Sequence, residues 1–347
     1  MKLGLAIVAM HLLTAQGTRV SSDGSARAFL DTLMPEQRAQ AVLAYDHPAK
    51  TVWSYTPGRR PGVSWAALSP EQRKAAHELL RASLSSAGYT KIEQIRELEP
   101  ILREMERGNP GRDPERYWFM FFGEPDRARP WVWRYEGHHL SLTFAYREGR
   151  LVSSTPQFLG AHPARAPVAG RLELRPLSKE QDLAFAFMET LTSEERSRAV
   201  VAERAPGDIL TTNSSRARLD DRSGLPVKGL APRSREALER LLEAHAEVQS
   251  ESEQKRRLDT LRREGLDNLV VAWMGPVAKG GRHYYRILGR TLIIEFDCTQ
   301  DDGNHIHVVW RDRNSDFGLD PLANHYARFH PQGGKRNLPP GAATKSE

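Results

Sequence analysis

Cysteine is almost absent from this chain of 347 residues, whose only thiol is Cys298. One thiol cannot form an internal disulfide, so a disulfide-rich scaffold, a zinc site built from cysteines and a redox pair are all excluded. The Gly-x-Ser-x-Gly turn of many hydrolases and the Walker phosphate loop are absent too. We expect Cys298 to be a small buried residue after a strand over 291–297, rather than a nucleophile or a copper ligand.

Charge of one sign is not concentrated anywhere along the chain. The 50 basic residues outnumber the 44 acidic ones, for a net charge of +6, but the arginines are spread over the whole length. This distribution predicts no nucleic-acid partner. With 39% hydrophobic residues, the chain is long enough to form a sizeable core in two domains or in one large domain.

Long hydrophobic runs are also missing, and the only candidate lies at the N-terminus. Met1 and Lys2 precede an apolar stretch over 3–10, and the small residues Ala15 and Gly17 follow. This pattern predicts a signal peptide over 1–20 and a periplasmic or secreted protein, with no membrane partner after cleavage because the run is too short to span a bilayer. A buried N-terminal helix is the alternative, since His11 interrupts the run.

An internal repeat organises the rest of the chain. Ala-Phe-Leu-Asp-Thr-Leu-Met-Pro-Glu-Gln-Arg over 28–38 corresponds to Ala-Phe-Met-Glu-Thr-Leu-Thr-Ser-Glu-Glu-Arg over 186–196. In both halves, amphipathic helical patterns are followed by patterns with a period near two. We predict an α+β fold made by tandem internal duplication, each half being several helices followed by an antiparallel β-meander. The halves should be related by a pseudo-twofold axis, with their sheets packed together. The predicted boundaries are a first repeat over 25–160, a linker over 161–177, a second repeat over 178–330 and a disordered tail over 331–347.

Two imidazoles separated by one residue stand out in Asn-His-Ile-His-Val-Val-Trp over 304–310. On a strand, His305 and His307 share one face, while the apolar residues between and after them form the core side. The same parity places His139 on the polar face of a strand over 139–144. It also places Glu295 and Asp297 on the polar face of the strand before the histidine pair.

Several tracts together resemble the bacterial and fungal domain-of-unknown-function family catalogued under number 3500. The tract His-Ile-His-Val-Val-Trp-Arg-Asp is the most specific of them, and the others include Gly-Glu-Pro, Trp-Val-Trp, Gly-His-His-Leu, Asp-Phe-Gly and His-Tyr. The resemblance covers most of the chain after the predicted signal. It implies an exported protein and supplies no mechanism. Thr143 and His162 stand where the family often has Asn, which makes a polar role at 143 less secure and suggests that His162 is a chance substitution in a linker.

From the residues themselves we predict a site for a single transition metal, with His139, His305 and His307 as ligands. Glu295 or Asp297 would be a fourth ligand or a hydrogen-bond acceptor behind the histidines. Imidazoles with a carboxylate suit zinc, copper or iron(II), and three protein ligands leave a position open. The alternative is a polar cleft without metal. Two further candidates are His138, which needs a bulge at Gly137 to join the site, and His325 on a short helix.

Arg311 and Asp312 follow the histidine strand and would bind an anionic substrate and act as general base; the alternative is a structural ion pair. The leading function is an exported metal-dependent enzyme, hydrolytic or oxidative, with a histidine-lined cleft between the repeats. One alternative is a non-catalytic exported protein that binds a metal or a small ligand, and another is a purely structural repeat module. The sequence leaves the small-molecule ligand and the oligomeric state open.

Overall fold

The computed structural model describes residues 22–168, 170 and 173–319. The segment 1–20, the tail over 331–347 and His325 therefore lie outside the described residues. Each half begins with helices whose starts match local signals. A capping box joins Ser69 to Gln72, and a second joins Thr192 to Glu195. The helices are α1 (Ser22–Thr32), α2 (Pro35–Ala41), α3 (Pro70–Ser83), α4 (Ser86–Met105), α5 (Ser178–Thr190), α6 (Ser193–Ala199), α7 (Pro232–Ala246) and α8 (Glu251–Glu264).

The strands in the described part of the chain form one mostly antiparallel sheet of 13 members. The first half contributes β1 (Val42–Leu43), β2 (Val63–Ser64), β3 (Tyr117–Phe122), β4 (Trp131–Gly137), β5 (Leu140–Arg147), β6 (Arg150–Ser153) and β7 (Gln157–Ala161). The second contributes β8 (Val200–Ala202), β9 (Leu225–Pro226), β10 (Val270–Met274), β11 (His283–Leu288), β12 (Leu292–Gln300) and β13 (His305–Asp312). The mixed α and β composition agrees with the predicted class, and none of the described helices is long and apolar enough to cross a bilayer.

The strand order is β1-β3-β4-β5-β7-β13-β12-β11-β10-β8. The two halves follow the same succession of strands when each is followed inward from its own edge of the sheet. A short parallel strand forms each edge, because β1 pairs with β3 and β8 with β10. Segments that match in sequence, such as β4 with β11 and β5 with β12, occupy mirrored places.

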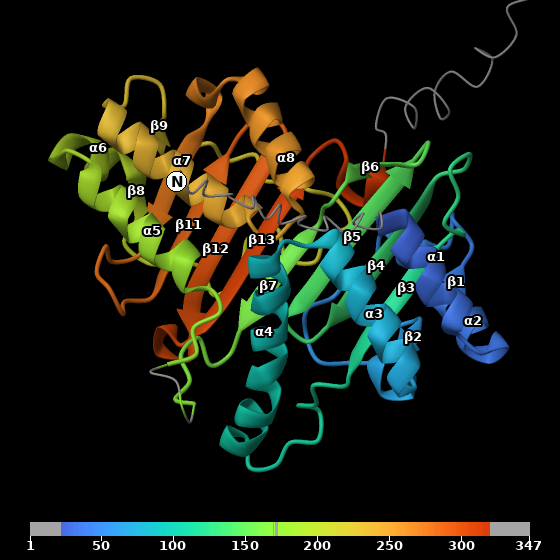
Figure 1. Ribbon diagram of the computed structural model, residues 1–347. Coiled ribbons are helices and arrows are strands. Elements are labelled where there is room, and N and C mark those ends of the chain that lie inside the picture. The colour runs from blue at the N-terminus through green and yellow to red at the C-terminus, as the bar shows by residue number, and fades with distance from the viewer. Residues whose placement is uncertain (1–21, 169, 171–172, 320–347) are drawn as a thin grey trace, which may run out of the picture.

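The two halves join edge to edge within this sheet, which corrects the expectation of two sheets packed on each other. β7 pairs with β13 in antiparallel register from Ala161 opposite Ile306 to Gln157 opposite Trp310. The helices cover one face (Figure 1), and the main hydrophobic core lies beneath them. The other face of the sheet is covered by side chains from long loops, namely Trp53, Tyr55 and Ile209, and not by a second sheet.

Strand parity follows the sequence pattern closely. The main core under the helices contains the alternating residues of three central strands, namely Leu140, Leu142, Phe144, Leu292, Ile294, Phe296, Ile306, Val308 and Trp310. The intervening residue Val309 lies on the opposite face with Phe158. His305 and His307, which share the parity of Val309, therefore belong to the face without helices.

Candidate metal centre

Three imidazoles converge on the helix-free face at the junction of the halves. The Nε2 atom of His139 lies 2.9 Å from Nε2 of His305 and 3.4 Å from Nε2 of His307. The two histidines of β13 meet because alternate residues of a strand point to the same side. His139 belongs to the turn between β4 and β5, where its φ of 60° is left-handed. The structure thus brings together the three ligands predicted from sequence.

A missing side chain lets His139 reach across the sheet. Strand β7 lies between β5 and β13, and Gly160 on β7 is opposite His307. A Cβ atom on Gly160 would stand 2.7 Å from Cδ2 of His139, a contact that real Cβ atoms essentially never make. The Gly160 N–H also donates to the His139 carbonyl at 2.7 Å. The His139 ring therefore occupies the space that any other residue at 160 would fill.

Carboxylates hold the outer nitrogens of the two β13 histidines. Nδ1 of His307 lies 2.7 Å from Oδ1 of Asp208, and Nδ1 of His305 lies 3.0 Å from Oδ2 of Asp301. A carboxylate acceptor assigns the proton to Nδ1, so the Nε2 lone pairs of both rings point toward His139. Metal-binding histidines have this same arrangement of carboxylate, imidazole and ion.

Burial lowers the pKa of two of these imidazoles, those of His139 and His305. His139 is 3% exposed and His307 is 4% exposed. Burial, followed by the neighbouring histidines, lowers the pKa of His139 well below its usual value. Burial and the adjacent His307 lower the pKa of His305 to about 3. Because a histidine must be deprotonated to bind a metal, protons do not compete for these two nitrogens near pH 7.

A second layer of polar groups lies behind His307. The Tyr55 hydroxyl donates to Oδ2 of Asp208 at 3.1 Å, which fixes that carboxylate. Asp297 on β12 is opposite His307 in the sheet, and polar atoms of Asp297, Asp208 and His307 all lie within 4.8 Å of one another. Burial raises the pKa of Asp297 to about 7, although the Thr299 hydroxyl donates to this carboxyl group.

The solvent side of the cluster is formed by Asp301 and His162. Oδ2 of Asp301 lies 3.2 Å from Nε2 of His162, so one carboxylate oxygen contacts two imidazoles. The His162 ring stacks on His305 with centroids 4.3 Å apart and planes 7° apart. Asp301 and Asp302 both have left-handed φ values, of 49° and 54°, in the tight turn before β13. This turn directs the Asp301 carboxylate back toward its own strand.

A cavity of about 500 Å³ is lined by residues that precede two carboxylates of this cluster in the chain. Its walls include Pro206, Gly207, Thr299 and Gln300, and these two segments lead directly into Asp208 and Asp301. Arg204 lines the same cavity. The residues that form the cavity and the carboxylates behind the histidines are therefore neighbours in the chain.

Two predicted ligands lie outside the three-histidine cluster. Glu295 accepts hydrogen bonds from Leu210 N–H at 2.5 Å, from the Tyr284 hydroxyl at 2.8 Å and from both donors of Thr211. Glu295 therefore anchors the loop that carries Asp208. Of the two predicted carboxylates, Asp297 is the one that faces His307. His138 lies 2.5 Å from Oε1 of Glu99 and stacks on His139 with centroids 3.8 Å apart.

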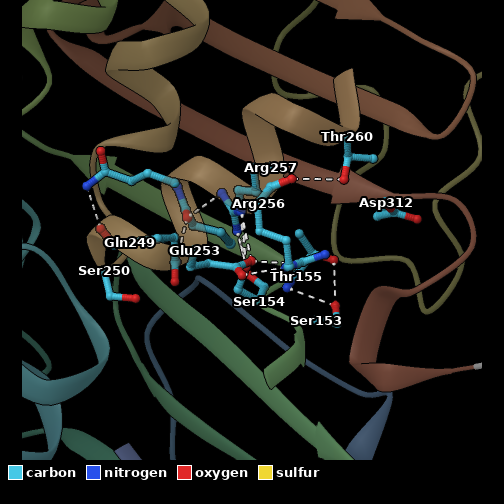
Figure 2. Close-up of polar contacts among 12 residues, drawn as sticks. Ser153, Ser154, Thr155, Gln249, Ser250, Glu253, Arg256, Arg257, Thr260 and Asp312 are labelled. Atoms are coloured by element: carbon cyan, nitrogen blue, oxygen red, sulfur yellow. Dashed lines mark hydrogen bonds and ion pairs between the residues drawn. The ribbon is translucent and has the colours of Figure 1, made fainter. Parts of the chain in front are cut away.

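Arg311 and Asp312 do not act as a pair. The buried Arg311 donates through Nε to Asp316 at 2.6 Å and through Nη2 to the Ser214 carbonyl at 2.8 Å. Asp312 is the next residue, so it points to the opposite face, where Figure 2 shows it beside the polar cluster of α8. Its Oδ1 accepts the Asn314 N–H at 2.8 Å. Neither residue reaches the histidines.

The sequence alone does not place three residues of the cluster, His162, Asp301 and Asp208. The sequence assigns His162 to a linker, although Gly-Ala-His over 160–162 contains both the glycine that makes room for His139 and the histidine that stacks on His305. Asp301 stands in the polar turn before the histidine pair, where its spacing of four residues from His305 was an available signal. Asp208 comes from a distant loop without any local motif.

The family model described as "Protein of unknown function (DUF3500)" matches residues 20–319, which confirms the resemblance seen in the sequence tracts. No curated protein and no solved structure matches the chain.

Proposed function

The chain belongs to the family described as Protein of unknown function (DUF3500), and from the geometry of its own histidines we propose that it is a transition-metal-dependent enzyme. His139, His305 and His307 are the proposed ligands. Asp208 and Asp301 orient the two rings of β13. The reaction is hydrolytic or oxidative, and its substrate occupies the cavity of about 500 Å³ that is lined by the segments preceding Asp208 and Asp301.

The convergence of the three Nε2 atoms carries this proposal. Bonds of roughly 2.0–2.1 Å to a tetrahedral zinc ion place neighbouring ligand nitrogens roughly 3.3 Å apart. The observed separations of 2.9 and 3.4 Å bracket that value. The lone pairs of His305 and His307 both face His139, which can present only one proton to them. A cation at the centre would satisfy all three nitrogens.

The ligand chemistry narrows the choice of ion. Three imidazoles without a thiolate suit zinc, copper and iron(II), and three protein ligands leave an open position. At such a position a metal ion lowers the pKa of coordinated water or binds a substrate oxygen. The Asp301 carboxylate, which is 53% exposed, is the ionisable group of the cluster that solvent reaches most readily. We assign it the role of accepting a proton from a bound ligand.

Metal content tests the proposal directly. Protein purified without a metal-affinity tag and reconstituted with zinc should retain one equivalent by mass spectrometry, and His305→Ala/His307→Ala should retain none. His47→Ala/His77→Ala is the matched control, because it removes two histidines outside the cluster and should leave the content unchanged. Equal zinc content in all three proteins would contradict the proposed metal centre.

A non-catalytic metal- or ligand-binding protein is the second candidate, favoured by the burial of His139 and His307. Zinc-, copper- and iron-loaded protein should be assayed for ester and phosphoester hydrolysis and for dioxygen consumption. Stoichiometric metal without turnover in any of these assays favours the binding protein. Turnover that disappears in His305→Ala/His307→Ala favours the enzyme.

We also propose that the halves arose by tandem duplication and that the chain is exported. The sequence repeat and the mirrored strand order support duplication. The basic and apolar start supports export. N-terminal sequencing of protein from the culture medium or periplasm should find a chain that begins near residue 20. An intact Met1 in the cytoplasmic fraction alone would contradict export.

A further inference from the structure

A second cavity opens at the far end of β13 from the histidines. It measures about 510 Å³ and lies between the loop over 215–220 and the turn that follows the strand. A strand rises about 3.4 Å per residue, so the eight steps from His305 to Arg313 span roughly 27 Å. A small molecule in this cavity cannot touch the histidine cluster.

Basic side chains outnumber acidic side chains in the lining of the cavity. Arg216, Arg218 and Arg313 contribute guanidinium groups, and Ser215 and Asn314 contribute polar groups. Within the described part of the chain, the Arg216 side chain has no hydrogen bond or ion pair. The exposed Arg216 therefore faces the cavity without a paired carboxylate among the described residues.

The two carboxylates of the lining are already occupied. Asp220 accepts from Nε of Arg218 at 2.6 Å and lies 3.7 Å from Nη1 of Arg313. Asp316 accepts from Nε of Arg311 at 2.6 Å and from the Asp312 N–H at 2.9 Å. Their charges are thus balanced by arginines, which leaves Arg216 in excess.

A buried donor lies beneath the same wall. Arg311 is fully buried, and its Nη1 has no hydrogen-bond partner among the described residues. Its two other contacts, to Asp316 and to the Ser214 carbonyl, reach the turn and the loop that line the cavity. An unpaired buried guanidinium nitrogen is costly unless an acceptor or water reaches it.

From these contacts we propose that the cavity is a second ligand site, which binds a small molecule through a carboxylate or phosphate group. Guanidinium groups offer paired N–H donors that match the oxygens of either group. The cavity volume lies in the range of small-molecule sites. Arg216 and Arg313 are the principal contacts, and Asn314 adds a polar contact. This site does not depend on the proposed metal centre.

Calorimetric titration of the full chain at low salt tests the proposal. The probes are inorganic phosphate, succinate and, as the neutral control, glucose. Phosphate or succinate should bind with a 1:1 stoichiometry and glucose should not. The preferred anion then identifies which of the two groups the natural ligand carries. Failure of both anions to bind at millimolar concentration overturns the site, as does equal binding of glucose.

Matched variants locate the binding. Arg216→Ala should weaken anion binding roughly tenfold, as expected for the loss of a charge-assisted hydrogen bond. Arg240→Ala removes another exposed arginine, on α7, where it pairs with Glu236, and should leave the affinity unchanged. His305→Ala/His307→Ala should also bind normally. Equal weakening by Arg216→Ala and Arg240→Ala would show only a general charge effect and would reject the site.

Discussion

Two polar clusters lie back to back at the junction of the halves, one on each face of the sheet. On the helix side, Arg257 of α8 donates to the Ser154 carbonyl at 2.8 Å and to Gln157 at 2.9 Å, and Glu253 accepts from Ser154. Figure 2 shows this network around Ser154 and Arg257. On the other face are His139, His305 and His307. Both clusters are buried and combine residues from both halves.

The clusters differ in how their polar atoms are satisfied. Arg257 has oxygen acceptors at all three guanidinium nitrogens, and its guanidinium also lies 4.6 Å from the Trp310 ring. The histidine cluster instead directs the acceptor nitrogens of His305 and His307 toward a third nitrogen. Burial and polarity therefore do not separate the structural network of Arg257 from the candidate site of the histidines. The candidate site differs because the lone pairs of its ring nitrogens converge on one point.

The largest effect should come from Arg257→Ala. Removing a buried cation leaves Glu253 with less compensation and takes away one of the two donors to Gln157 Oε1, the other being Gln249. We therefore expect a loss of about 3–5 kcal/mol in the free energy of unfolding. Urea denaturation measures this loss. Arg256→Ala is the control, because Arg256 binds the same Glu253 but is 42% exposed. Comparable losses of stability in Arg257→Ala and Arg256→Ala would contradict the structural role assigned to the buried Arg257 network.

Gly160→Ala should act on the opposite face. The added Cβ would displace the His139 ring, so zinc affinity should fall at least roughly a hundredfold, equivalent to about 2.7 kcal/mol. The free energy of unfolding should fall by about 1–3 kcal/mol. Gly207→Ala is the control, since its Cβ would meet no atom within 4 Å. Unchanged zinc affinity in Gly160→Ala would remove His139 from the site.

Acid should destabilise the histidine face of the metal-free protein. The pKa of His305 is lowered to about 3 in the folded chain, against about 6.5 when unfolded. The unfolded state therefore binds more protons between these values, and stability falls as pH drops below about 6.5. From pH 6.5 to 5 we expect a loss of about 2 kcal/mol from this residue. Urea midpoints measure it, and His305→Gln should show a shallower decline than the wild type.

A loss of zinc affinity no larger than that of Gly160→Ala should follow substitution of the carboxylates behind the rings. Asp208→Asn and Asp301→Asn keep the shape of the side chain but weaken the acceptor at Nδ1, so zinc affinity should fall roughly 10–100-fold. Competition with a chromogenic chelator measures the affinity. Asp302→Asn provides the comparison, because Asp302 contacts Arg282 rather than a histidine. An effect of Asp302→Asn as large as that of Asp301→Asn would argue against the assigned role.

Much of the local structure could be predicted because it depends on periodicity within short segments. The capping box at Ser69 and the period-two patterns of β5, β12 and β13 were readable directly. Parity also selected His139, rather than His138, as the partner of the β13 histidines. The pairing of β7 with β13 could not be predicted, because an edge that joins two halves has no local signature. Glu295 illustrates the same limit: parity gave its face but not its partners in the loop over 210–211.

By itself, the sequence determined which residues can share a face, because the side-chain period of a strand is a property of the backbone. It therefore placed His305 and His307 together and opposite the core. The tertiary structure alone decided what meets them. Asp208 arrives from a loop about a hundred residues earlier, and His139 crosses β7 only because residue 160 is a glycine. These contacts depend on the register between distant strands, which no local pattern encodes.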